Sequence, residues 1–118
     1  MNIRKFGVAI FAALAFCIGS AFAALPAIAP TGQVDLAVST TSASVAIPTT
    51  GTPTQVIVTN MGPLTAFVLL GNSSVTASVA TGIAILPYTS VVLTIGANTN
   101  LAAITQGNTT VLSITAGT

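Results

Sequence analysis

Gln33-Val34-Asp35-Leu36-Ala37-Val38 shows the alternation of side chains on which the fold prediction depends. Val34, Leu36 and Val38 occupy every second position, and Asp35 lies between them. Successive side chains of a β-strand point to opposite faces of the sheet. The alternation therefore predicts a half-buried strand with Asp35 on the solvent face.

The same period of two continues to the end of the chain, interrupted by turn-forming clusters of Pro, Gly and Asn. We expect eight or nine short strands, over residues 33–38, 42–47, 54–60, 64–70, 75–79, 83–86, 90–95, 101–105 and 109–115. Residues 64–70 are apolar on both faces and predict a central strand, with Phe67 in the core. Strands at this spacing predict an all-β fold, a single small β-sandwich or jelly roll over residues 33–118.

Charge is almost absent from this chain of 118 residues. It holds two cations, Arg4 and Lys5, one acid, Asp35, and no histidine. Nucleic-acid binding draws most of its affinity from Lys and Arg that neutralise phosphates, and residues 24–118 contain neither. We therefore expect no nucleic-acid partner.

The same composition removes the usual catalytic groups. Beyond residue 24, only Asp35 and Tyr88 could take part in acid–base chemistry, and Tyr88 is more simply a rim residue with its hydroxyl in water. A Ser-His-Asp triad, a Ser-Lys dyad and a zinc site all lack their ligands or bases. We expect no catalytic, cofactor-binding or metal-binding residues, and no enzyme. The glycosylation-like triplets at 72–74 and 108–110 coincide with predicted turns.

The N-terminus predicts a hydrophobic leader over residues 1–23. A basic start, an apolar run over 6–23 and the small-residue pattern Ala21-Phe22-Ala23 together describe a secretory signal peptide. The alternative is a retained anchoring arm, an apolar helix at the lower length limit for spanning a bilayer. Cys17, the lone cysteine, fits a lipobox poorly because Phe16 precedes it. Residues 24–32 contain two prolines and predict an extended linker.

Uncharged sheet edges are an aggregation hazard unless a partner covers them. The strands here are rich in Thr and Val, and they lack the Lys and Glu that usually protect such edges. We therefore expect a homo-oligomer or permanent contact with other proteins.

From Ser42 onward the chain resembles a family of small bacteriophage virion proteins, of the head-decoration or minor capsid type. The residues that carry the resemblance are spaced pieces: QVIVTNMG at 55–62, TAFV at 65–68, GNSSVTA at 71–77, ILP at 85–87, AAIT at 102–105 and TVLSITAG at 110–117. The resemblance covers about two-thirds of the chain and implies a β-sandwich that assembles on a virion. It carries over no catalytic residues.

Two functions follow as expectations. The first is a non-enzymatic virion subunit that decorates or cements the capsid or neck, located in the virion and contacting copies of itself and other virion proteins. Its only membrane contact would be through residues 6–23. The alternative is an exported structural or adhesive subunit of the bacterial surface or extracellular matrix. A carbohydrate-binding module ranks third, because Tyr88 is the sole tyrosine and tryptophan is absent.

Overall fold

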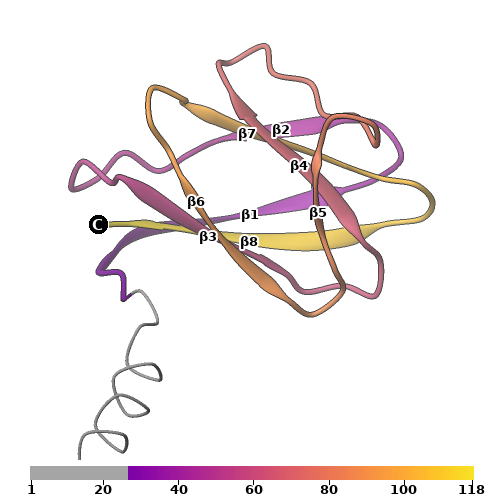
Figure 1. Ribbon diagram of the computed structural model, residues 1–118, viewed down its shortest axis with the longest axis horizontal. Helices are drawn as coiled ribbons and strands as arrows, with labels where there is room; N and C mark the ends of the chain where they lie inside the picture. Colours follow the sequence, from indigo (N-terminus) through magenta and orange to yellow (C-terminus); the bar gives the residue numbers. More distant parts are fainter. Residues whose placement is uncertain (1–26) are drawn as a thin grey trace, which may run out of the picture.

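The computed structural model describes residues 27–118, and the predictions for the leader lie outside this range. The described chain is all-β, with no helix, and it holds eight strands (Figure 1). They are β1 (Pro30–Val38), β2 (Ala43–Ala46), β3 (Gln55–Asn60), β4 (Ala66–Gly71), β5 (Ile83–Ile85), β6 (Ser90–Thr94), β7 (Asn100–Thr105) and β8 (Thr110–Gly117).

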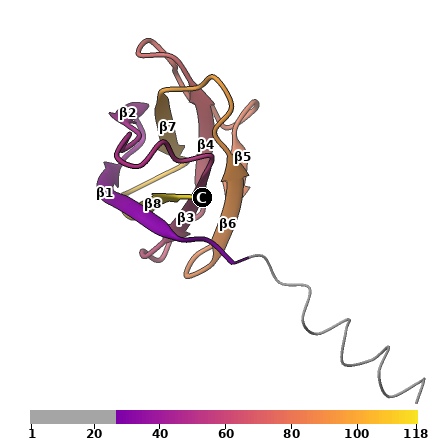
Figure 2. The ribbon, with the colours of Figure 1, turned by 90° about the vertical axis from the view of Figure 1, so that its left-hand side faces the viewer.

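The strands form two four-stranded antiparallel sheets. Sheet A has the order β1-β8-β3-β6, and sheet B has the order β2-β7-β4-β5. The pairs β1–β8, β2–β7, β3–β6 and β4–β5 are nested, as in one long hairpin whose tip is the β4–β5 connection. The edge strands gather at two sides: Figure 2 shows β1 and β2 on one side and β5 and β6 on the other.

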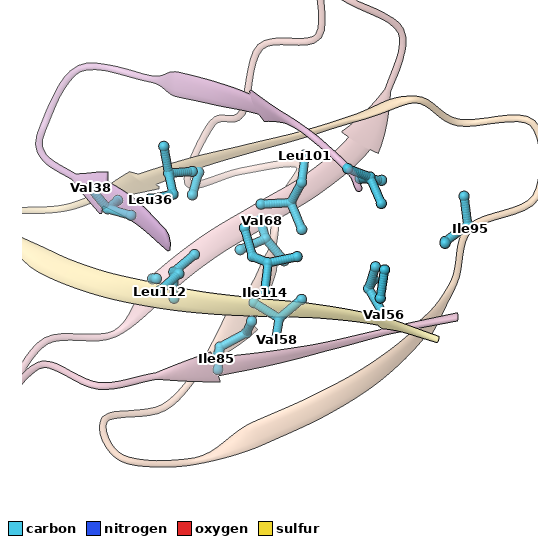
Figure 3. Packing of buried hydrophobic residues seen from close by; sticks show 14 residues of the cluster. Leu36, Val38, Val56, Val58, Val68, Ile85, Ile95, Leu101, Leu112 and Ile114 are labelled. Carbon is cyan, nitrogen blue, oxygen red and sulfur yellow. The ribbon is translucent and has the colours of Figure 1, made fainter. Parts of the chain in front are cut away.

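One hydrophobic core fills the space between the sheets, which makes the fold β-sandwich-like. Its side chains come from both sheets and include Leu36, Val38, Val56, Val58, Val68, Ile85, Leu101, Leu112 and Ile114 (Figure 3). Most of these are fully buried, and each contributes about 1.5–3 kcal/mol relative to an exposed side chain. The apolar residues that recur at every second position are therefore the ones whose side chains form the core.

The strand predictions are confirmed for most elements and corrected for two. β1 begins at Pro30, so the expected linker over 24–32 ends early: Pro30 and Gly32 already pair with β8, and the register shifts between them. The strand expected over 75–79 is wrong. Residues 72–82 form the β4–β5 loop, with turns closed by Val75 N–H on Asn72 O (3.1 Å) and Gly82 N–H on Ser78 O (2.8 Å). Asn72 favours the first turn, because its side-chain oxygen accepts from the backbone of Ser74.

Phe67 is not in the core, contrary to expectation. β4 is a central strand, as predicted, and Ala66 and Val68 are its inward residues. Phe67 therefore points to the outer face of sheet B, where it is half-buried. Gly82 of the β4–β5 loop lies so close that a Cβ there would be 2.8 Å from the Phe67 Cβ. This loop packs over the apolar outer face of sheet B.

Candidate interaction surface

The outer face of sheet A is neutral and rich in hydroxyl groups. Thr59 of β3 and Ser90 of β6 share a hydrogen bond of 2.8 Å on this face. On β8 the outward residues are Val111, Ser113 and Thr115, and Val111 is 43% exposed. No described segment covers this face as the β4–β5 loop covers sheet B. It can offer hydrogen bonds and small apolar contacts, but no ion pair except through Asp35.

Asp35 lies on the solvent face of β1, as the alternation predicts, and it is exposed. Its carboxylate accepts a hydrogen bond from Gln33 Nε2, which also donates to Ser113 Oγ at 3.1 Å. β1 is an edge strand, so the sole charged side chain of the described residues lies at one of the two edges of sheet A. A charge at this place opposes pairing with another strand.

Tyr88 occupies a strained turn between β5 and β6. Thr89 N–H donates to Leu86 O (3.2 Å), which leaves Pro87 and Tyr88 as the two central residues. The φ of Tyr88 is +58°, a value that a type II turn requires at this position and that Gly or Asn adopts more easily. Its side chain is 71% exposed. Residues held in such conformations are frequent at the functional sites of proteins.

The structure does not bring Asp35 and Tyr88 together. β1 and β6, the strands nearest to them, are opposite edges of sheet A with β8 and β3 between them. Three steps of about 4.8 Å separate these edges by roughly 14 Å. Within residues 27–118 no three metal-ligating side chains gather. The two groups are therefore single surface residues.

Two further exposed apolar residues lie on loops at the end of the molecule that Tyr88 occupies. Met61 and Leu86 are each 60% exposed. The loops that carry them are joined through the backbone, because Asn60 N–H donates to Thr89 O at 2.9 Å. Met61 N–H donates to Val111 O of β8 at 2.8 Å. Met61, Leu86 and Tyr88, here called the loop-tip cluster, are the three most exposed large apolar side chains of the described chain.

Asn60 organises this end and was not singled out from the sequence. It is fully buried. Its Nδ2 donates to the carbonyls of Leu64 and Ile85, and its Oδ1 accepts from Gly62 N–H (3.2 Å) and Thr110 Oγ1 (2.8 Å). The amide thus uses both donors and both acceptor positions. The signal in the sequence was the Asn-Met-Gly-Pro stretch, which predicted only that a strand ends there.

In the described part of the chain, 27–118, no helix has the length and apolarity to cross a membrane. Comparison with protein-family models, with curated proteins and with solved structures finds no match to this chain.

Proposed function

We propose that this protein is a non-enzymatic structural subunit of a phage virion, which decorates or cements the capsid or neck. It would be located in the virion and contact copies of itself and other virion proteins. The proposal rests on the topology of the strands and on the chemistry of the surface.

The topology is the observation that carries the proposal. Nested pairs β1–β8, β2–β7, β3–β6 and β4–β5, split between two sheets, are the arrangement expected when a long antiparallel hairpin rolls up. We therefore assign the fold, more finely, as an eight-stranded jelly roll. Viral capsid proteins use this architecture repeatedly, as do some lectins and cupins.

The amino-acid composition distinguishes among these three classes of jelly-roll protein. Cupin metal sites are built from ligands such as His, and this sequence contains none. Sugar sites favour aromatic platforms, and the exposed aromatic here is the single Tyr88. A subunit that packs against other proteins needs neither, and a neutral hydroxyl-rich face with apolar loop tips suits such packing.

The alternative is an exported structural or adhesive subunit of the bacterial surface. It is favoured by one observation, the signal-like pattern of residues 1–23. The fold accommodates both functions, because a jelly roll can assemble on a capsid or on a cell envelope.

The test determines whether the protein is a component of purified phage particles. Phage particles from a culture that carries the gene are purified by density gradient, and the protein is quantified against the major capsid subunit by mass spectrometry. Virion function predicts a fixed stoichiometry that survives repeated banding. Recovery only in the envelope or medium fraction of the same culture would refute it and support the exported subunit.

A further inference from the structure

Among the described residues 27–118, no strand pairs with the outer edge of β6, and its backbone groups there are unpaired. On its other side, β6 pairs with β3. Two flanking bonds, Asn60 N–H to Thr89 O and Ile95 N–H to Thr54 O, show which residues of β6 direct their backbone groups to β3 and which direct them away. In an antiparallel ladder every second residue directs both its N–H and its C=O to the neighbour. Val91 and Leu93 therefore bond to β3. Ser90, Val92 and Thr94 direct their backbone groups to the open edge.

The two edges of sheet B are both short. β5 has three residues and β2 has four, and Pro48 follows β2 closely. Ser42, just before β2, is engaged by the β4–β5 loop through Ala77 N–H on its Oγ (2.9 Å). Short and partly engaged edges resist pairing with another chain.

The other edge of sheet A is protected differently. β1 starts at Pro30, its register shifts between Pro30 and Gly32, and Asp35 lies at the centre of its free edge. Proline, irregularity and charge are three devices by which proteins block edge pairing. β6 has none of them: its register with β3 is uninterrupted from Ser90 to Thr94, and it holds no charge or proline.

We propose that β6 pairs with β6 of a second copy of this chain, antiparallel about a two-fold axis at Val92. In this register Val92 faces Val92 of the other copy, and Ser90 faces Thr94. The three outward residues of each strand then exchange backbone hydrogen bonds, so the edge is complementary to itself. The cross-strand pairs are also favourable, one apolar and two between hydroxyls.

The pairing closes at two copies. The joined sheet has eight strands and ends in β1 on both sides, where Asp35 opposes further addition. The inference goes beyond the proposed function, because a β6 dimer could serve a virion or a bacterial surface equally. If the protein were absent from virions, the proposed β6 dimer would not be contradicted.

Disulfide trapping tests the axis in the full-length chain, with Cys17→Ala removing the native thiol. Facing residues of a hydrogen-bonded pair lie about 5.5 Å apart at Cα, inside the range of about 4.4–6.8 Å for a disulfide. Val92→Cys should therefore convert to a covalent dimer under mild oxidant. The matched control is Val111→Cys on the central strand β8, because Val92 is 42% exposed and Val111 is 43% exposed. Equal rates of dimer formation by the two variants would overturn the proposal.

A mixing experiment tests the register. Ser90→Cys and Thr94→Cys chains should form covalent heterodimers when mixed, because each thiol faces the other across the axis. Either variant alone should form few dimers, since its two thiols would be separated by four residues, roughly 13 Å along the strand. Covalent homodimers that form as readily as heterodimers would exclude this register.

A third experiment removes the pairing itself. Val92→Pro deletes an N–H that points to the open edge and leaves the β3–β6 bonds in place. Light scattering coupled to size exclusion should show wild type and Val111→Lys as dimers, and Val92→Pro as a monomer with an unchanged far-UV spectrum. A monomeric wild type, or a dimeric folded Val92→Pro, would contradict the β6 interface.

Discussion

Thr110, the first residue of β8, donates a hydrogen bond of 2.8 Å to Oδ1 of Asn60, the last residue of β3, and both side chains are buried. The bond joins β3 and β8, which are neighbours in sheet A, at the end of the sheet where β3 ends and β8 begins. Asn60 extends the link to β5 through the carbonyl of Ile85 (3.0 Å). One amide thus holds the loops on which the loop-tip cluster lies.

Replacing Thr110 by Val should lower the free energy of unfolding by about 1 kcal/mol, the usual worth of one buried hydrogen bond. Asn60→Ala should cost considerably more, because it leaves two carbonyls and two donors without partners. The double variant should be less destabilised than the sum of the single variants, since the Thr110 hydroxyl is no longer orphaned. Urea unfolding followed by circular dichroism measures all three. Thr115→Val, on the outer face of β8, is the control and should change stability little.

Gly62 is required by the same network. A Cβ at this position would overlap Thr110 Oγ1, so Gly62→Ala should destabilise the protein by roughly 1–3 kcal/mol through overpacking. Adding Thr110→Ala removes the overlapping oxygen and should recover a small part of the loss, because the Thr110 Cβ still lies 2.8 Å from the added Cβ. Gly96→Ala meets no atom within 4 Å but has a φ of +59°, and it should cost only about 1 kcal/mol. Thermal unfolding that ranks Gly96→Ala as the more harmful variant would contradict this account.

The fold could be predicted to the level of strands, because burial on one face imposes period two on the sequence. Val34, Leu36 and Val38 show this pattern without interruption, and all three pack in or against the core. The failures lie where the outer face is also apolar. Phe67 is large and lies in an apolar strand, yet it points to the outer face of sheet B. It can do so because the β4–β5 loop covers it there. When both faces of a strand are apolar, the period of the sequence does not show which face lies in the core.

The interaction surface could be predicted less well, since it depends on which strands become edges. Strand order joins residues far apart in sequence, as when β1 pairs with β8. Nothing local to residues 90–94 marks them as an edge. Asp35 was assigned to the solvent face from its neighbours alone, but its position on the opposite edge of the same sheet needed the topology.

Tyr88→Asn should stabilise the protein. A non-glycine residue with φ near +58° costs about 1 kcal/mol or more, and Asn tolerates this conformation better than most residues. Most of the Tyr88 side chain is exposed, so little packing is lost. The melting temperature should rise for Tyr88→Asn and fall for Tyr88→Val, because a β-branched residue is worse at positive φ. If Tyr88 contacts a partner, the same Asn variant should bind purified particles more weakly although it is more stable.

Asp35→Asn should convert a closed assembly into an open one. The charge lies at the centre of the free edge of β1, where pairing between two copies would place like charges opposite each other. Without it, both edges of sheet A could pair and dimers could join into longer chains. Turbidity and thioflavin fluorescence should increase for Asp35→Asn at neutral pH. Ser44→Asn, on the outer side of the short strand β2, is the control. Aggregation by the control to the same extent would show that the charge at β1 is not the cause.

The fate of residues 1–23 separates the two proposed functions. An exported subunit would be cut after Ala23, because small side chains at Ala21 and Ala23 suit signal peptidase, and its first residue would be Ala24. A virion subunit assembled without export would keep the apolar run over 6–23 and must bury it against lipid or a neighbouring subunit. Each large apolar side chain left in water would otherwise cost about 1.5–3 kcal/mol.

We expect the retained form, because the virion proposal requires no export. Intact-mass spectrometry of the protein taken from purified particles should give the mass of the full chain. Ala23→Phe provides the matched test: it should block cleavage and accumulate precursor if the protein is exported. If the arm is retained, it should change the mass only by the substituted side chain and leave particle incorporation unchanged. A native mass equal to that of residues 24–118 would exclude the retained arm and make the exported surface subunit the better proposal.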